Sequence, residues 1–519
     1  VSRAMETVLG QLHEHNLAKE SESLSKFYAS VERRAADVVT ANGRQELIYK
    51  LYDSFFKGAF PVLTQRLGIV YTPVEVVDFI IHSVNDVLKA QFGQTLGSEG
   101  VHILDPFTGT GTFITRLLQS GLIAPDELAR KYREEIHANE IVLLAYYIAA
   151  INIETVYHEL IQGELTEDAP YEPFRGILLT DTFQMYEQER DMVANLLPDN
   201  SERRTRQKAL DIRVIIGNPP YSAGQKNAND EAGNVKYPSL DCAIRKEYAV
   251  HSASSLTNKL YDSYIRAFRW ASERIGDSGI VAFVSGSGWV ERPFADGMRK
   301  CLVEEYSDLY LFHLRGDIRK NMLSGGTARE GQNVFASGSM TGISIAVLVK
   351  NPNATERGRI FFHDIGADLS TKEKLGIIRS LGSIEGISSG SGWTRIIPNE
   401  SNDWLDQVDQ RFDRFPVIGR KNKNEDTISI FSTYSLGVST NRDDWVVASS
   451  SLKLRENVSK TIQFFNSQVS LLASGGQKVD YDETLIKWSS TLIPKASRVG
   501  EQAFDALKVR KNLYRPFTI

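Results

Sequence analysis

A short apolar strand that runs into a Gly-x-Gly turn and a helix is the feature that most constrains this fold. Residues 101–105 are typical of a buried strand, and residues 106–113 lead through Gly109 and Gly111 into a predicted helix. Strand, glycine turn and helix form the first unit of a nucleotide-binding α/β sheet. Asp105, at the strand end, can accept a hydrogen bond from an ammonium or hydroxyl group. Neither G-x-x-x-x-G-K-[ST] nor G-x-G-x-x-G is present here, which disfavours a Walker loop or a dinucleotide site.

The alternation of strand and helix continues downstream. Residues 135–140 are predicted to be a strand that ends in Glu140, residues 141–156 a strongly apolar helix, and residues 177–183 a third strand that leads into Asp181. Each acid alone could be a solvated strand end. Because open α/β sheets bind ligands at the carboxyl ends of their strands, the three acids together indicate a ligand site.

A fourth strand delivers an unusual polar loop. Val214–Gly217 is β-branched and apolar, and it is followed by Asn218, Pro219, Pro220 and Tyr221. Two prolines stiffen the backbone and leave their carbonyls as acceptors. Asn adds a side-chain carbonyl, and Tyr adds a flat aromatic face. The group suits a planar substrate with an amino group, although an ordinary strand–turn has the same pattern.

The chain ahead of the first strand is predicted to be helical. Residues 1–66 have apolar residues at helical spacing and suggest a connector without chemistry. A second helix is expected from residue 73 to about 88. Thr72 is its predicted N-cap, Pro73 its first residue, and Glu75 the partner of Thr72 in a capping box. The free N–H groups of such a helix start also favour a carboxylate ligand.

The sheet is expected to extend to residue 350. Further strands are predicted at 279–285, 309–314 and 342–350. From residue 351 the predicted strands are shorter, Gly and Ser are frequent, and four of the six tryptophans occur. This stretch is interpreted as a separate domain. Its basic cluster at 420–423 and its polar–aromatic stretch at 434–445 would suit contacts to phosphates and bases.

Composition limits the class of protein only loosely. A length of 519 residues fits two to four domains, and the net charge of −5 gives no pointer to nucleic acid. The chain has two cysteines, Cys242 and Cys301, and no run of 18 apolar residues. A reducing cytoplasm is the expected location. Because the chain starts at Val1 and ends at Ile519 without a polar tail, it is expected to be a fragment.

The strand ends together resemble the adenine-specific DNA methyltransferases of the gamma motif order. The pattern of that family is a T-P helix start, D-P-x-x-G-x-G, an acid, an Asp and N-P-P-Y, followed by target recognition. The matching positions are Tyr71-Thr72-Pro73, Asp105–Gly111, Glu140, Asp181-Thr182 and Asn218–Tyr221. The resemblance covers about residues 67–350.

A narrower resemblance is to the single-chain type ISP restriction–modification enzymes. It depends on the helical lead-in, the F-T-G-T-G-T-F turn and residues 434–445. It implies a helical coupler at 1–66, a methyltransferase domain at 67–350 and an α+β target-recognition domain, possibly truncated, at 351–519. The expected fold is a Rossmann-like methyltransferase sheet with helices on both faces. A nuclease and an ATP-dependent translocase would lie upstream in the parent chain.

The resemblance also assigns roles. Asn218, Pro219, Pro220 and Tyr221 would be catalytic, Tyr221 would stack on the target base, and Phe335 would be a second wall. Glu140 would bind the ribose hydroxyls of S-adenosylmethionine, and no metal is implied. The implied cofactor contacts are Tyr71, Thr72, Asp105, Pro106, Phe107, Thr108, Gly109, Gly111, Thr112, Phe113, Glu140, Asp181 and Thr182.

The expected function is methyl transfer from S-adenosylmethionine to the amino group of a flipped-out adenine in double-stranded DNA. Two alternatives stay open at the level of sequence. Enzymes with N-P-P-Y also methylate glutamine amides in proteins, and related motifs modify RNA bases. A DNA-specificity module with a relic cofactor fold is the non-enzymatic alternative.

Overall fold

The computed structural model describes residues 72–161, 171–187, 198–220, 237–254, 257–324, 328–335, 341–405, 414–419, 428–433, 440, 442–473, 486, 492 and 500–511. The chain divides into two compact units, with the boundary near residue 406. The expected helices within 1–66 lie outside the described residues. So do the basic cluster at 420–423 and residues 434–439. None of the helices in the described ranges is long and apolar enough to cross a membrane.

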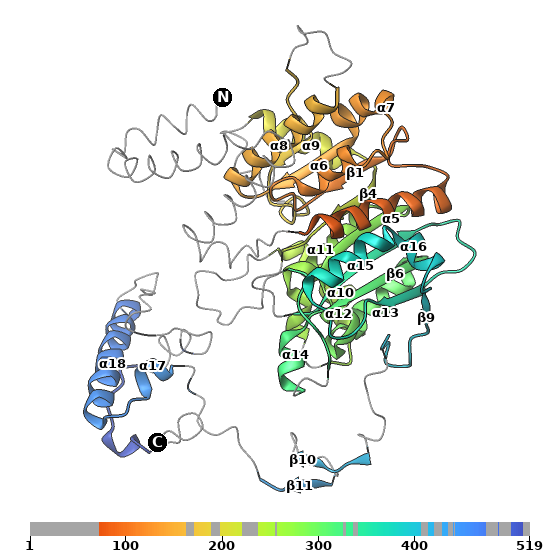
Figure 1. Ribbon diagram of the computed structural model, residues 1–519. Helices are drawn as coiled ribbons and strands as arrows, with labels where there is room; N and C mark the ends of the chain where they lie inside the picture. The colour runs from red at the N-terminus through yellow and green to blue at the C-terminus, as the bar shows by residue number, and fades with distance from the viewer. Residues whose placement is uncertain are drawn as a thin grey trace. The chain divides into compact units, whose positions relative to one another are not determined.

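The first unit is built on one sheet of nine strands (Figure 1). The strands are β1 (His102–Asp105), β2 (Ile136–Glu140), β3 (Ile177–Leu179), β4 (Ile212–Gly217), β5 (Gly279–Gly286), β6 (Asp308–Arg315), β7 (Ile343–Lys350), β8 (Arg359–Asp364) and β9 (Thr394–Ile396). Their order across the sheet is β3-β2-β1-β4-β5-β7-β6-β8-β9.

Strand direction determines which strand ends share an edge. Strands β3, β2, β1, β4 and β5 pair in parallel, β7 is antiparallel to both β5 and β6, and β6 pairs in parallel with β8. Strand β9 is antiparallel to β8. The carboxyl ends of β1 to β6 therefore all lie along one edge of the sheet.

Helices cover both faces of this sheet. In the described part of the first unit the α-helices are α5 (Val74–Phe92), α6 (Thr112–Gln119), α7 (Pro125–Arg130), α8 (Leu143–Ile161), α9 (Pro198–Ala209), α10 (Pro238–Glu247), α11 (Ser263–Arg274), α12 (Gly288–Glu291), α13 (Asp296–Glu305), α14 (Ile318–Leu323), α15 (Thr371–Leu381) and α16 (Ile384–Ser389). Short π- and 3₁₀-helices are η1 (Lys131–Glu135), η2 (Ala249–His251), η3 (Thr257–Tyr261) and η4 (Pro293–Ala295).

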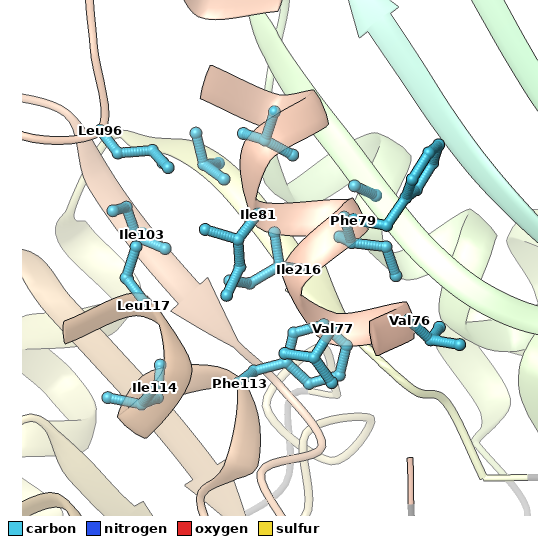
Figure 2. Packing of buried hydrophobic residues seen from close by; sticks show 14 of the residues in the cluster. Val76, Val77, Phe79, Ile81, Leu96, Ile103, Phe113, Ile114, Leu117 and Ile216 are labelled. Carbon is cyan, nitrogen blue, oxygen red and sulfur yellow. The ribbon is translucent and has the colours of Figure 1, made fainter. Parts of the chain in front are cut away.

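Two buried hydrophobic clusters lie on opposite faces because successive strand residues point in opposite directions. Ile103 of β1 belongs to the cluster under α5, α6 and α8, whereas its neighbour Leu104 belongs to the cluster under α10, α11 and α13. Figure 2 shows the first cluster, with Val77 of α5 beside Phe113 of α6. The predicted α/β fold with helices on both faces is confirmed.

The start of α5 differs from the prediction. The N-cap residue is Pro73, which has φ −56° and ψ 139°, and no side chain caps the helix. Thr72 therefore lies outside the helix, where its hydroxyl meets Asn218, and Glu75 forms an ion pair with Arg379 of α15. The predicted capping box is wrong because both of its side chains have tertiary partners instead.

The predicted domain boundary at 350–351 falls inside the sheet. Strand β8 pairs with β6 over six residues, and β9 extends the same sheet. Helix α15 is anchored to it by Lys374, whose buried ammonium donates to the carbonyls of Leu314, Glu330 and Gln332. Because β8 is close to the sheet edge and only one of its residues is fully buried, its sequence is more polar than that of a central strand.

The second unit begins after residue 406 and mixes strands with helices. Its elements are β10 (Val417–Gly419), β11 (Ser429–Phe431), α17 (Asp443–Val446), α18 (Ser451–Ala473) and η6 (Ala506–Lys508). Strands β10 and β11 pair in parallel. This composition agrees with the expected α+β domain at the C-terminal end.

Candidate active site

Four of the predicted polar residues lie at the carboxyl ends of four adjacent strands. Asp105 and Glu140 are the last residues of β1 and β2, Asp181 follows β3 by two residues, and Asn218 follows β4 directly. In the order β3-β2-β1-β4, this places all four along one continuous stretch of the sheet edge. The sequence patterns therefore identified a group of residues that the fold brings together.

Asp105 is fully buried beneath the glycine turn. Its Oδ1 accepts a hydrogen bond of 3.0 Å from the backbone N–H of Phe107, while Oδ2 has no partner among the described residues. Burial raises the pKa of this carboxyl from 3.8 to about 8. A Cβ on Gly217 would lie 2.9 Å from Asp105 Oδ1, so the glycine at the end of β4 allows the close approach of the two strand ends.

Glu140 ties the glycine turn to the second strand. Its Oε2 accepts from the N–H of Gly109 at 2.8 Å, and its Oε1 accepts from the N–H of Val142 at 2.7 Å. Burial raises the pKa of Glu140 from 4.5 to about 7. Both oxygens keep further lone pairs, so a pair of hydroxyl donors can still approach the carboxylate.

The turn itself depends on two glycines in the left-handed region. Gly109 has φ +56° and Gly111 has φ +89°. A Cβ on Gly111 would lie 3.3 Å from Cα of Ala149 in α8, so the turn packs directly on that helix. The hydroxyl of Thr108 donates to the carbonyl of Asp105 at 3.0 Å and closes the turn over the strand end.

Asp181 is held by a residue that the sequence prediction missed. Its Oδ2 accepts from the hydroxyl of Tyr237 at 2.9 Å, and its Oδ1 accepts from the N–H of Phe183 at 2.9 Å. Burial raises the pKa of Asp181. Tyr237 lies just before α10, far from any strand end, so no strand-end pattern could have found it.

Aromatic rings surround Asp181. The ring of Phe183 lies 5.5 Å from that of Phe107 and 5.2 Å from that of Tyr237, measured between centroids. The hydroxyl of Thr182 donates to the carbonyl of Pro106 at 2.6 Å and joins the loops after β3 and β1. A flat apolar wall beside a carboxylate fits a heterocycle that carries an amino group.

Asn218 presents an unpaired acceptor. Its Nδ2 donates to the hydroxyl of Thr72 at 2.9 Å, and its Oδ1 is buried with no hydrogen-bond partner in the described part of the chain. Pro219 is buried and Pro220 half-buried beside it. An unsatisfied buried acceptor is costly in a folded protein and is characteristic of a site that awaits a ligand donor.

The remaining predicted site residues are either buried in the described core or lie outside the described residues. Phe113 and Thr112 are buried at the start of α6, and the ring of Phe113 packs in the core. Phe335 is buried in the same core cluster and lines a separate pocket with Glu75. Tyr71 and Tyr221 lie outside the described residues, and so do the predictions made for them.

Comparisons with known proteins agree with the predicted resemblance. A model of the type ISP restriction–modification enzyme coupler domain matches residues 1–43, and a model of the type ISP C-terminal specificity domain matches residues 429–519. A search of curated proteins gave no match.

Solved structures match over nearly the whole chain. The ATP-dependent type ISP restriction–modification enzyme LlaBIII bound to DNA is 41% identical, with a TM-score of 0.83 over 97% of this chain and 33% of that chain. A nuclease-deletion mutant of the type ISP enzyme LlaGI, in complex with a DNA substrate mimic, is 42% identical, with a TM-score of 0.80 over 97% and 40%. The DrdV–DNA complex is 31% identical, with a TM-score of 0.79 over 97% and 48%.

The first unit is a Rossmann-like α/β sheet with the predicted site residues along one edge, and residues 429–519 match a type ISP C-terminal specificity domain. The chain spans less than half the length of each of these three relatives. It corresponds to the part of the type ISP restriction–modification enzymes that runs from the coupler to the specificity domain.

Proposed function

We propose that this chain is an S-adenosylmethionine-dependent DNA methyltransferase that modifies the exocyclic amino group of an adenine turned out of the duplex. The observation that carries the proposal is the buried Oδ1 of Asn218, which has no hydrogen-bond partner among the described residues and is fixed through Thr72 beside three strand-end acids. An acceptor in this state is suited to an amino hydrogen.

The residues present fit the cofactor. Oδ2 of Asp105, without a partner in the described part of the chain, is an available acceptor, the glycine turn allows close backbone approach, and Glu140 can take two hydroxyl groups. Asp181, with Phe183 and Phe107 beside it, can take an adenine ring and its amino group. When bound, S-adenosylmethionine would supply an electrophilic methyl group on a sulfonium.

The chemistry then depends on the acceptors of this chain. The amino lone pair of adenine is delocalised into the ring, which makes the nitrogen a poor nucleophile. Asn218 Oδ1 would accept one amino hydrogen and the carbonyl of Pro219 the other, which favours a pyramidal nitrogen with a localised lone pair. Acceptors that are already oriented lower the barrier without reorganisation.

The proposal that the substrate is DNA is supported by the similar type ISP enzymes. LlaBIII is described as bound to DNA and LlaGI as in complex with a DNA substrate mimic, and the C-terminal unit matches a specificity domain. By the same likeness, we infer that nuclease and ATP-dependent translocase parts accompany this part in a longer chain. That enzyme would act on DNA in the cytoplasm.

The test is incubation with methyl-labelled S-adenosylmethionine and a set of duplex plasmids, followed by nuclease digestion and chromatography of the nucleosides. Label in N6-methyladenine would support the proposal. Label in protein or RNA would favour the glutamine-amide or RNA alternative. Tight DNA binding without any labelled product would favour a specificity module.

A further inference from the structure

Helix α14, whose place in the first unit is labelled in Figure 1, carries two large apolar side chains that are exposed to solvent. Met322 is 72% exposed and Leu323 is 90% exposed. We name these two residues the α14 tip. Single exposed apolar residues are ordinary on protein surfaces, but two adjacent ones at the end of a short helix form a protruding apolar patch.

Polar contacts hold the first turn of α14, which supports the α14 tip. The side chain of Asp317 accepts from the N–H of Lys320 at 2.9 Å and pairs with Arg292 at 2.8 Å. The ammonium of Lys320 pairs with Glu291 at 2.9 Å and with Glu330 at 3.2 Å. These contacts fix the first turn of α14, so the tip is held outward by its support.

The base of α14 is also held from below. The three carbonyls that Lys374 binds are those of Leu314, at the end of β6, and of Glu330 and Gln332, in the segment behind α14. Lys374 is fully buried, and its loss would leave all three acceptors without this donor.

Helix α14 begins at the same edge of the sheet as the candidate active site. Helix α14 follows β6, whose carboxyl end shares an edge with that of β4. In the strand order β4-β5-β7-β6, the two ends are three strand spacings apart, roughly 14 Å. A pocket of about 940 Å³ beside α14 is lined by Met322, Phe335 and Glu75, and Glu75 is in the first turn of α5, three residues after Thr72.

Cations accompany the apolar side chains. Arg319 is exposed on α14 itself, and Lys372 is exposed on α15 and lines the same pocket as Met322. An apolar tip flanked by cations matches the chemistry of duplex DNA, where phosphates lie on either side of stacked bases. Proteins that deform DNA insert Leu, Met or Ile between base steps in this way.

We propose that Met322 and Leu323 form a wedge that enters the DNA stack at the position left by the target adenine, while Arg319 and Lys372 contact the flanking phosphates. This inference rests on the proposed function, because a vacated position exists only if a base leaves the duplex. The wedge lowers the free energy of the opened duplex by replacing lost stacking contacts with apolar ones.

The test compares two substrates with the double variant Met322→Ala/Leu323→Ala. The methylated position is first mapped on plasmid DNA with the wild-type protein. A 40-base-pair duplex with that site is then used either fully paired or with an abasic nucleotide opposite the target adenine. Opening a paired base costs a few kcal/mol, so we expect kcat/KM on the paired duplex to fall about 10- to 100-fold. On the abasic duplex, where little opening energy is needed, the loss should be less than about threefold.

Two controls isolate the wedge. Val250→Ala removes another exposed apolar side chain of the same unit and should leave both rates unchanged. Met322→Leu/Leu323→Met keeps the apolar volume and should restore methylation of the paired duplex. An equal loss on both substrates, or no loss on either, would overturn the wedge.

A second readout follows opening directly. The target adenine is replaced by 2-aminopurine, a fluorescent base. Binding of the wild-type protein should raise the fluorescence of the 2-aminopurine, and binding of the double variant should raise it much less. If the wild-type protein labels no DNA, the proposed function fails. If it labels DNA and the double variant opens the base normally, only the wedge fails.

Discussion

Single carboxyl groups set the charge of the candidate site. Asp105 and Glu140 are buried, and burial raises the pKa of the first to about 8 and of the second to about 7. Near neutral pH both therefore carry a proton for part of the time. A ligand that donates hydrogen bonds prefers the ionised form, so its binding is coupled to proton release.

The first prediction concerns the pH dependence of cofactor affinity. Because hydroxyl donors favour ionised Glu140, affinity for S-adenosylmethionine should rise as pH increases from 6 to 8, with release of protons. Isothermal titration calorimetry in two buffers of different ionisation enthalpy measures both quantities. Glu140→Gln cannot ionise, so it should bind about tenfold more weakly, a loss of roughly 1.4 kcal/mol, and release fewer protons. Equal proton release by both proteins would contradict the role of Glu140.

The same shift has a consequence for stability without cofactor. Since the folded pKa of Glu140 exceeds its usual value of 4.5, its contribution to the free energy of unfolding is fully present below pH 4.5 and is lost as pH rises through about 7. For Asp105, the corresponding window runs from 3.8 to about 8. Chemical denaturation at a series of pH values measures this effect. The free energy of unfolding of Glu140→Gln and of Asp105→Asn should fall less with rising pH than that of the wild type.

The second prediction concerns Asn218. Asn218→Ala removes the proposed acceptor while leaving the three acids, so methyl transfer should fall about 100-fold, or ~3 kcal/mol, with cofactor affinity unchanged. Single-turnover rates and calorimetric cofactor titrations measure the two effects. Asn353→Ala, in the exposed loop after β7, is the matched control. Near-normal turnover by Asn218→Ala would contradict the proposed role of Asn218 as an acceptor for the amino group.

At the scale of elements, the third prediction concerns the glycine turn that starts α6. Gly111→Ala would put a Cβ at φ +89° and 3.3 Å from Ala149 of α8. A left-handed non-glycine residue costs about 1–2 kcal/mol, so urea denaturation should show at least that loss in the free energy of unfolding. Gly376→Ala is the control, because this glycine lies inside α15 with open space around it, and Ala should stabilise the helix by about 0.5–1 kcal/mol.

Elements with strong local signals were predictable from sequence. Strands β1 and β4 appear where apolar runs precede Asp105 and Asn218, because a central strand buried on both faces has a nearly continuous apolar run. Strand β8, the second strand from the sheet edge, was missed because most of it is only half-buried.

Tertiary partners account for the remaining differences. Nothing local shows that Thr72 would meet Asn218 in place of the helix N–H groups, since the two residues are 146 positions apart. Tyr237 was missed for the same reason, because its bond to Asp181 spans 56 positions. The strand-end part of the site was therefore predictable, while the side chains that hold it came only from the fold.

At the scale of the whole molecule, the fourth prediction concerns where the first unit ends. A chain cut after residue 350 would lose β8, α15 and Lys374, which exposes the edge of β6 and leaves three carbonyls without their buried donor. It should aggregate or fail to unfold cooperatively. A chain cut after residue 406 should keep the first unit intact. Thermal unfolding followed by circular dichroism distinguishes the two, and cooperative unfolding of the shorter chain would contradict the boundary.

The position of β7 between β5 and β6 has a consequence for synthesis on the ribosome. Strand β7 is made after both of its neighbours, so β5 has no partner on that side until residue 350 has emerged. Translation proceeds at about 5–20 residues per second, so the interval from the end of β5 lasts roughly 3–13 seconds. During that time an apolar strand edge is open to pairing with other chains. Yield of native protein should therefore depend on translation speed through this stretch and on chaperones that bind exposed strands.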